Sequence, residues 1–226
     1  MYVLGIDTST MTGGVALLQG DQLVGESVLN IRTTHSERLL PALEELFISG
    51  GIEVDQVGLL SVVTGPGSFT GLRIGVATAK GLSYSLGIKL VGVTTLEAYG
   101  WQFQHFPGTV LALVDARREN VFWQAFRAGV ALHDPAWGTL GEVLEWSRSV
   151  QRSEEPVLYV GDGAVNYAEQ LGDVRKVQPS QALLRPSAVA HLGYTKFLQG
   201  EESDAFTLNP TYMRQTEAER KWQGQT

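Results

Sequence analysis

The chain contains no cysteine. This absence excludes disulfide bonds, zinc sites built on thiolates, iron–sulfur clusters and cysteine nucleophiles. Two signatures of catalysis are also missing, because neither GxxxxGK[ST] nor GxSxG occurs in the sequence. No run approaches the roughly 18 apolar residues of a membrane helix, and MYVLGIDTST at the start carries no basic leader. We therefore expect a soluble, cytoplasmic protein without a membrane partner.

Charge is sparse and mostly negative. Charged residues make up 18% of the 226 residues, and 17 basic against 24 acidic side chains give a formal net charge of −7. Binding to a nucleic-acid backbone needs clustered Lys and Arg, so this balance argues against a strong nucleic-acid binder acting alone. Apolar residues make up 43%, which predicts one large folded domain or two small ones.

The first hundred residues alternate between strand and helix patterns. Three short apolar runs joined by tight turns predict an antiparallel meander at residues 3–7, 14–18 and 23–28. A helix should open at Thr34, since Glu37 follows at capping-box spacing, and Pro41 should bend it. The later patterns predict strands at 57–63 and 89–93 and helices at 68–86 and 96–103. The resulting order, β-β-β-α-β-α-β-α, predicts a layered α/β domain.

The opening pattern starts again after Gly108. Residues 110–115 (VLALVD) repeat the apolar run that ends in aspartate at 3–7 (VLGID). Residues 120–126 follow this run as the predicted second strand at 14–18 follows the first. A match of two strands is weak by itself, but it suggests duplicated lobes. We expect an N-terminal lobe at 1–107 and a smaller C-terminal α/β lobe at 108–226, with a strand at 156–163, a helix at 187–198 and a frayed polar tail from Glu217.

Two polar turns are candidates for binding a phosphate. Asp7, Thr8 and Ser9 follow the first strand, and residues 64–68 (TGPGS), with Gly65, Gly67 and Ser68, lead into a helix. Backbone amides at such turns can hold an anion, and an aspartate can hold a hydrated cation. The alternatives are an Asx turn at Asp7 and a simple N-cap at Ser68.

The helix from Ser68 carries small residues four apart, at Gly71, Gly75 and Ala79. An interior glycine costs roughly 1 kcal/mol relative to alanine, which makes sense if another helix approaches that face closely. The sequence leaves open whether this neighbour is internal or belongs to a second chain.

No catalytic constellation stands out. The four histidines, at 35, 105, 133 and 191, form no pair at i, i+4, and are more typical of surface or capping positions than of metal ligands. The adjacent acid pairs at 44–45, 154–155 and 201–202 diverge on a helix and are typical of solvated surface.

With these residues in hand, the chain resembles the TsaB (YeaZ) family, the dimerisation subunit of the bacterial machinery that makes threonylcarbamoyladenosine in tRNA. The matching segments run in order along the whole chain, at residues 5–9 (GIDTS), 35–41 (HSERLLP), 65–73 (GPGSFTGLR), 92–96 (GVTTL), 115–118 (DARR) and 210–214 (PTYMR). The segment at 65–73 is highly specific in combination with the others.

The resemblance implies a duplicated α/β fold of the actin/hexokinase-like (ribonuclease H-like) type with a reduced second lobe. It also implies no catalytic residues here. The catalytic relative, TsaD, carries a metal-binding HxxxH, and Thr95 and Tyr99 stand at the aligned positions. Neither is a strong ligand for a divalent ion at neutral pH, so the resemblance implies no metal site and no peptidase activity.

The resemblance further implies assembly with a TsaD-type catalytic subunit and a TsaE-type ATPase. The contact would involve the helices that start near His35 and Ser68, through His35, Leu39, Leu43, Phe69, Gly71, Leu72, Arg73, Gly75 and Ala79. ATP or ADP would bind near the subunit junction and not tightly to this chain, and tRNA would be contacted indirectly. Without its partner, the chain could form a homodimer through the same surface.

The expected function is therefore that of a non-catalytic scaffold and activator in threonylcarbamoyl modification of adenosine beside the anticodon. The alternative is an ATP-dependent small-molecule kinase of the same fold, in which Asp7 and Thr8 would bind the phosphate. A stand-alone metallopeptidase is the weakest alternative, because its ligands are missing.

Overall fold

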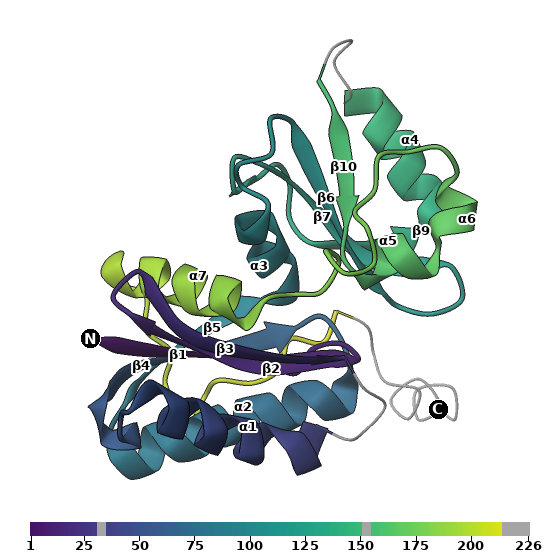
Figure 1. Cartoon of the computed structure of the whole chain (residues 1–226). Coiled ribbons are helices and arrows are strands. Elements are labelled where there is room, and N and C mark those ends of the chain that lie inside the picture. Colours follow the sequence, from purple (N-terminus) through teal and green to yellow (C-terminus); the bar gives the residue numbers. More distant parts are fainter. Residues whose placement is uncertain (31–34, 151–154, 214–226) are drawn as a thin grey trace.

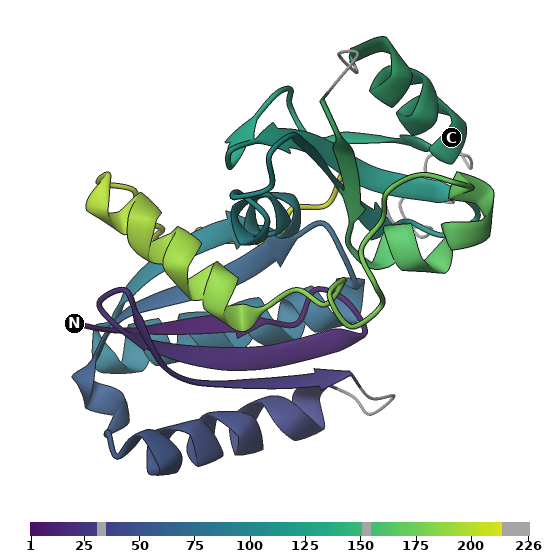
Figure 2. The same cartoon turned by 45° about the horizontal axis from the view of Figure 1, so that its top comes forward.

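The computed structural model describes residues 1–30, 35–150 and 155–213. The predicted capping residue Thr34 and the predicted frayed tail lie outside these residues. Two five-stranded sheets organise the described part of the chain, each carrying helices on both faces (Figures 1 and 2).

The first sheet has the strand order β3-β2-β1-β4-β5. The strands β1 (Tyr2–Asp7), β2 (Thr12–Gln19) and β3 (Gln22–Asn30) form the predicted antiparallel meander. The strands β4 (Val57–Gly65) and β5 (Lys89–Thr94) continue the sheet in parallel with β1. Since parallel neighbours need crossover connections, two helices lie between these strands in sequence, as predicted.

The second sheet repeats this plan in reduced form. The strand β6 (Thr109–Asp115) pairs antiparallel with β7 (Asn120–Arg127) and parallel with β10 (Val157–Val160), as β1 does with β2 and β4. Two short strands, β8 (Val130–Ala131) and β9 (Ala136–Thr139), pair with β7. The repeat suggested by the sequence is therefore confirmed. The sequence patterns missed β8, β9, the helices α4 (Leu140–Val150), α5 (Asp162–Asn166) and α6 (Ala168–Leu171), and the 3₁₀ helix η1 (Val54–Gln56).

The helices separate the molecule into layers. The helices α1 (His35–Gly50) and α2 (Phe69–Leu86) cover one face of the first sheet (Figure 1). The helices α3 (Thr95–Gln102) and α7 (Pro186–Leu198) lie between the two sheets and share one continuous apolar core with both of them. A third core lies on the far face of the second sheet, against α4.

The second sheet begins with β6 directly after the predicted division at residue 107, but later parts of the chain return to the first lobe. The helix α7 belongs to the second half of the sequence but packs on the first sheet, where the Ser61 hydroxyl donates a hydrogen bond to the Val189 carbonyl (2.7 Å). The segment 201–213 then returns along the first lobe, and the Ser203 and Thr211 amides donate to the carbonyls of Leu90 and Thr64. These contacts join residues far apart in sequence, so composition along the chain did not reveal them.

The start and end of α2 agree with the sequence signals. The Ser68 hydroxyl accepts a hydrogen bond from the Gly71 amide (3.3 Å), and Gly87 adopts a left-handed conformation that closes the helix. Across the three described stretches, none of the helices combines the length and the apolar composition that crossing a lipid bilayer requires.

Candidate functional site

The two predicted phosphate turns lie side by side at the carboxyl ends of β1 and β4. The Ser68 amide donates to the Ser9 carbonyl at 2.6 Å, and a Cβ on Gly67 would lie 2.1 Å from the same oxygen. Only glycine at position 67 therefore allows the two turns to approach this closely. The structure brings together Asp7, Thr8, Ser9, Gly65, Gly67 and Ser68.

The polar groups of the first turn bond mainly to one another. The Asp7 carboxylate accepts hydrogen bonds from the Ser9 amide (2.8 Å) and the Ser9 hydroxyl (2.7 Å), which is the Asx turn expected as the alternative. The Thr8 hydroxyl donates to the Gly71 carbonyl of α2 (2.8 Å). Asp7, Thr8 and Ser9 are buried. Binding of a nucleotide phosphate at this turn stays a prediction.

Thr95 and Tyr99 are buried polar residues of α3. The Thr95 hydroxyl donates to the Pro66 carbonyl (2.6 Å), and the Tyr99 hydroxyl donates to the Ala182 carbonyl (2.9 Å). Burial raises the pKa of the Tyr99 phenol well above its ordinary value, and the nearby carboxylates of Asp162 and Asp7 add to the rise. Both side chains therefore act as hydrogen-bond donors that join α3 to its neighbours. Within the part of the chain that the structure describes, no three His, Cys, Asp or Glu side chains gather as a metal site would require.

A second acidic cluster, which the sequence patterns did not single out, lies at the corresponding end of the second sheet. The Asp162 carboxylate accepts a hydrogen bond from the Asp115 amide (3.0 Å). The Asp115 carboxylate accepts from the Tyr167 hydroxyl (2.6 Å) and the Asn166 amide (3.1 Å). Burial raises the pKa of Asp162 to about 6, and the Asp115 carboxylate adds to this rise against the opposing effect of the Asp115 amide. In the duplicated topology Asp115 is the counterpart of Asp7, since Asp115 ends β6 as Asp7 ends β1.

We predict that Asp162→Asn stabilises the chain at neutral pH. A carboxyl with a folded pKa of about 6 and an ordinary value of 3.8 binds protons more tightly when folded, so stability falls as pH rises from about 4 to about 6. Asparagine carries no charge and can still accept the Asp115 amide. The free energy of unfolding at pH 7 should rise by about 1–3 kcal/mol, with little change at pH 4. Urea denaturation across this pH range measures both values. An equal effect at pH 4 and pH 7 would contradict the prediction, and Asp173→Asn at an exposed position is the control.

The small face of α2 is not exposed, which corrects the sequence prediction. Gly71, Gly75 and Ala79 are buried, and a Cβ on Gly75 would lie 2.3 Å from the Thr8 hydroxyl oxygen. The close neighbour is therefore internal, and it is the turn after β1 that requires the missing side chains.

Most of the predicted interface residues face the interior for the same reason. Leu39 and Leu43 are buried in the core between the first sheet and its covering helices, and Leu72 is buried in the core that α3 and α7 share with both sheets. Phe69 and Arg73 are exposed, and His35 begins α1, although its side chain lies outside the described set. The first sheet covers the apolar stripe of α1 that contains Leu39 and Leu43. A contact with another chain along these helices stays a prediction, and of the predicted residues Phe69 and Arg73 are exposed for it.

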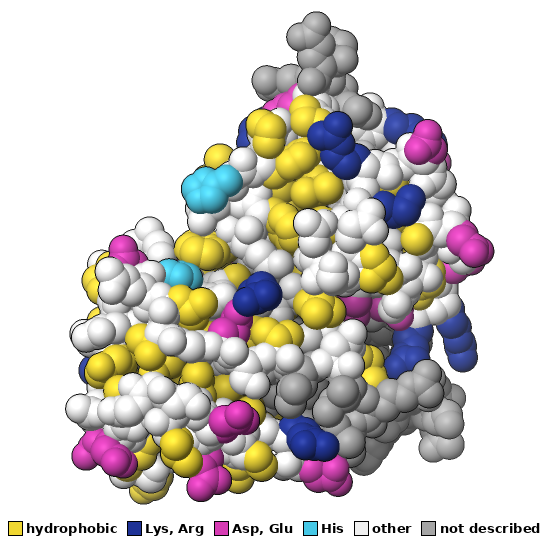
Figure 3. Space-filling view, in the orientation of Figure 1, with side chains coloured by type: hydrophobic (Ala, Val, Ile, Leu, Met, Phe, Trp, Pro, Cys, Tyr) yellow, Lys and Arg dark blue, Asp and Glu magenta, His cyan; other side chains and the backbone are white. Residues whose placement is uncertain are grey.

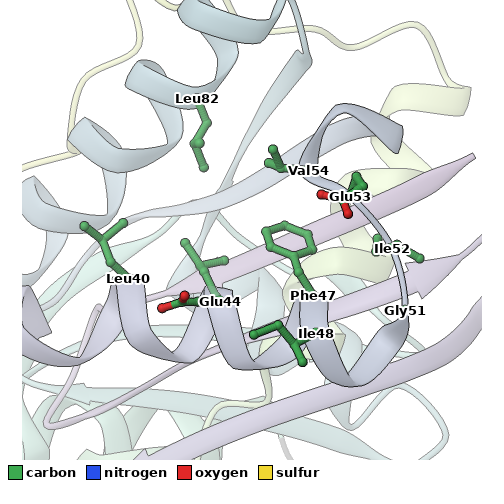
Figure 4. Close-up of a pocket in the computed structure, with 10 residues that line it drawn as sticks. Leu40, Glu44, Phe47, Ile48, Gly51, Ile52, Glu53, Val54 and Leu82 are labelled. Carbon is green, nitrogen blue, oxygen red and sulfur yellow. The ribbon is translucent and has the colours of Figure 1, made fainter.

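The outer surface of α1 and α2 carries large exposed apolar side chains. The exposed fraction is 61% for Leu40 and 74% for Ile48 on α1, and 72% for Tyr84 on α2. Hydrophobic and acidic side chains alternate over the lower part of the first lobe, where α1 lies (Figure 3). A hollow of about 600 Å³ opens between the two helices (Figure 4). Such a surface is typical of a site where another protein docks.

A cluster of exposed side chains fixes the end of the described chain to the start of α2. The Arg73 guanidinium lies 3.8 Å above the Phe69 ring, and its Nε donates to the Tyr212 hydroxyl (3.1 Å). The Phe69 and Tyr212 rings are 5.0 Å apart. Because these residues are far apart in sequence, no local pattern could have revealed the cluster. It orients Phe69 and Arg73 at the edge of the exposed helical surface.

Comparisons with known proteins agree on one pathway. The profile described as "TsaD: tRNA N6-adenosine threonylcarbamoyltransferase" matches residues 23–147. The tRNA threonylcarbamoyladenosine biosynthesis protein TsaB of Bacillus subtilis is 33% identical, and the match covers 98% of each chain. Among solved structures, YeaZ from Pseudomonas aeruginosa has a TM-score of 0.80 at 25% identity, covering 94% of this chain and 99% of that chain.

More distant structures support the fold alone. Component A of (R)-2-hydroxyglutaryl-CoA dehydratase from Acidaminococcus fermentans has a TM-score of 0.55 at 12% identity, covering 87% of this chain and 98% of that chain. With the two related sheets, this likeness confirms the predicted duplicated α/β fold.

Proposed function

Because the chain belongs to the TsaB (YeaZ) family of tRNA threonylcarbamoyladenosine biosynthesis, we propose that it is a non-catalytic scaffold and activator subunit. It pairs with a TsaD-type catalytic subunit, and a TsaE-type ATPase joins them, for threonylcarbamoyl modification of adenosine next to the anticodon. The observation that carries the proposal is the exposed apolar surface of α1, formed by Leu40 and Ile48.

The state of Thr95 and Tyr99 supports a non-catalytic role. The resemblance to TsaD implies two metal-binding histidines at these positions, and here both side chains are buried donors to backbone carbonyls. A hydroxyl engaged in this way, with a phenol whose pKa is raised further by burial, is a poor ligand for a divalent ion.

The hydrogen bonds of the β1 turn suggest where a nucleotide binds. Since Asp7, Thr8 and Ser9 already bond within the chain, the turn offers few free groups for a phosphate. We propose that ATP or ADP is held at the junction with a partner and not tightly by this chain. The net charge of −7 fits a subunit that leaves most tRNA contacts to its partners. The comparisons do not favour the small-molecule kinase considered as an alternative.

The experiment is reconstitution of the modification from purified subunits. A TsaD-type subunit, a TsaE-type ATPase, threonylcarbamoyl-adenylate and an ANN-decoding tRNA are incubated with and without this chain, and the modified adenosine is measured by mass spectrometry. We expect product to form at least tenfold faster with the chain present. Equal product without it would overturn the proposal. The chain alone, given ATP and candidate sugars, should show no phosphorylated product, and robust turnover there would support the kinase instead.

A further inference from the structure

The turn that joins β6 to β7 has an unusual backbone. Arg117, Arg118 and Glu119 have φ angles of 70°, 55° and 58°, in the left-handed region that residues other than glycine rarely adopt. Within the described part of the chain, Ala128 is the other non-glycine residue with such an angle. Three in a row cost conformational energy and persist only where neighbouring groups hold them. Because strained residues of this kind cluster at functional sites, the exposed side chains of the turn are candidates for binding.

Hydrogen bonds hold this backbone in place. The Asn120 side-chain amide donates to the carbonyls of Arg117 (3.3 Å) and Arg118 (2.9 Å). The Arg117 backbone amide donates to the Asp115 carboxylate (2.7 Å), and the Asn120 backbone amide donates to the Arg117 carbonyl (3.2 Å). These bonds fix the main chain and leave both arginine side chains exposed. A binding group on a backbone that is already ordered loses little freedom when its ligand arrives.

The turn keeps positive charge on a chain whose net charge is −7. Among the described residues, no ion pair involves Arg117 or Arg118. The Asp115 carboxylate already accepts the Arg117 amide and the Tyr167 hydroxyl (2.6 Å). Glu119 is exposed in the same turn and offsets one of the two positive charges. Two guanidinium groups remain at the surface, and their forked N–H groups match the oxygens of a phosphate.

An exposed tryptophan lies beside this turn. In the antiparallel pairing of β7 with β9, Asn120 is opposite Thr139 and Phe122 is opposite Trp137. Trp137 therefore lies two residues further along the sheet than the end of the turn, or about 7 Å at roughly 3.4 Å per residue. Its side chain is 48% exposed. An exposed indole ring is a stacking surface for a nucleobase, since every base has an aromatic face.

We propose that Arg117, Arg118 and Trp137 form a contact site for a single-stranded segment of the substrate tRNA. The arginines bind backbone phosphates, and the indole stacks on a base. The proposal rests on the proposed function, which brings a tRNA to the complex, and it adds a direct contact to the indirect one expected from the sequence. Arginine and aromatic side chains together are the chemistry by which proteins bind unpaired RNA, whereas the bases of a duplex are already stacked on one another.

The first test removes the two charges. Arg117→Gln and Arg118→Gln are combined, and the matched control combines Arg148→Gln with Arg175→Gln, at exposed positions elsewhere in the second lobe. The complex of each chain with the TsaD-type subunit is titrated against an ANN-decoding tRNA by fluorescence anisotropy over a range of salt concentrations. Affinity should fall at least tenfold for the turn variant. The slope of log K against log salt should become less steep by about 1.5, at roughly 0.7–0.9 per phosphate. The control should change both values much less.

The second test separates stacking from charge. Trp137→Ala should weaken tRNA binding at least about fivefold and leave the salt slope unchanged, because stacking on a base releases no counterions. Phe206→Ala, which removes another exposed aromatic ring, is the control. Lysine at both Arg117 and Arg118 should restore the slope but not the full affinity, since lysine keeps the charge without the fork. Thermal denaturation identifies any variant that fails to fold, and the arginine variants test the site even if Trp137→Ala is unstable.

The outcomes separate this proposal from the function beneath it. If the wild-type complex does not bind tRNA, or if neither the charge variant nor Trp137→Ala changes its affinity, the contact site is overturned and the scaffold function stands. If the charge variant and its control weaken binding equally, the effect is one of net charge and the proposal is overturned. If a fluorescent ATP analogue loses affinity for the variants while tRNA keeps it, the occupant is a nucleotide and the proposal is again overturned. If the wild-type chain does not accelerate the reconstituted modification, it is the scaffold function that fails.

Discussion

Gly75→Leu should destabilise the isolated chain by more than about 3 kcal/mol, even in the absence of any partner. A Cβ at position 75 would lie 2.3 Å from the Thr8 hydroxyl oxygen, and leucine adds three further carbon atoms. Thr8 cannot easily move, because it is 2% exposed and its hydroxyl bonds to the Gly71 carbonyl. The better helix propensity of leucine, worth roughly 0.8 kcal/mol over glycine, is too small to offset this overlap. Urea denaturation followed by circular dichroism measures the loss.

Gly81→Leu is the matched control on the same helix. Gly81 is exposed, and nothing lies within 4 Å of a Cβ at this position, so the substitution should leave the fold intact. A further control removes the Thr8 hydroxyl, which is the group that a side chain at position 75 would overlap. Gly75→Ala should be much less costly in a Thr8→Ala background, since that change removes the Thr8 hydroxyl oxygen and leaves the Thr8 Cβ at 3.5 Å from the new methyl group. A stable Gly75→Leu chain that fails only in assembly would show that the small face serves a partner after all.

Arginine at both Leu40 and Ile48 should abolish assembly while sparing the chain. The two side chains are 61% and 74% exposed, so the free energy of unfolding should change by less than about 1 kcal/mol. If a TsaD-type subunit covers them, two charges would be buried in an apolar contact, and affinity should fall at least about a hundredfold, or roughly 3 kcal/mol. Pull-down and calorimetry measure the binding, and the tRNA modification assay should lose activity in proportion.

Val130→Arg is the control for this substitution. Val130 is a similarly exposed apolar residue (68%), but it lies on β8 of the second lobe, away from α1 and α2. Its replacement should change neither assembly nor activity. Normal assembly by the Leu40 and Ile48 variant would remove the outer surface of α1 from the interface and, with it, the main support for the proposed function.

Periodicity predicted most of the first lobe correctly because its elements are long and regular. The meander, the crossover strands and α2 with its Ser68 cap follow from local alternation, helical spacing and a glycine stop. Apart from α4, the elements missed in the second lobe are short, such as β8 with two residues and α5 with five. Local propensity cannot specify such elements, since packing around them decides their conformation.

The candidate site was only partly visible in the sequence. Asp7 and Ser9 are two residues apart, which is the spacing of an Asx turn, and the structure contains this turn. The cluster of Asp115 and Asp162 joins residues 47 positions apart, and the contact of Arg73 with Tyr212 joins residues 139 positions apart. No spacing rule along the chain could have connected them.

The sequence by itself determined the α/β class, the duplicated plan, the positions of the glycine turns and the presence of small residues on α2. Only the tertiary structure decided which surface those residues face. Gly71, Gly75 and Ala79 allow a neighbouring segment to approach α2 closely. Their small side chains leave the same space whether that segment belongs to this chain or to another one. Folding placed the turn after β1 against them, buried Leu39 and Leu43 on the first sheet, and left Leu40 and Ile48 exposed.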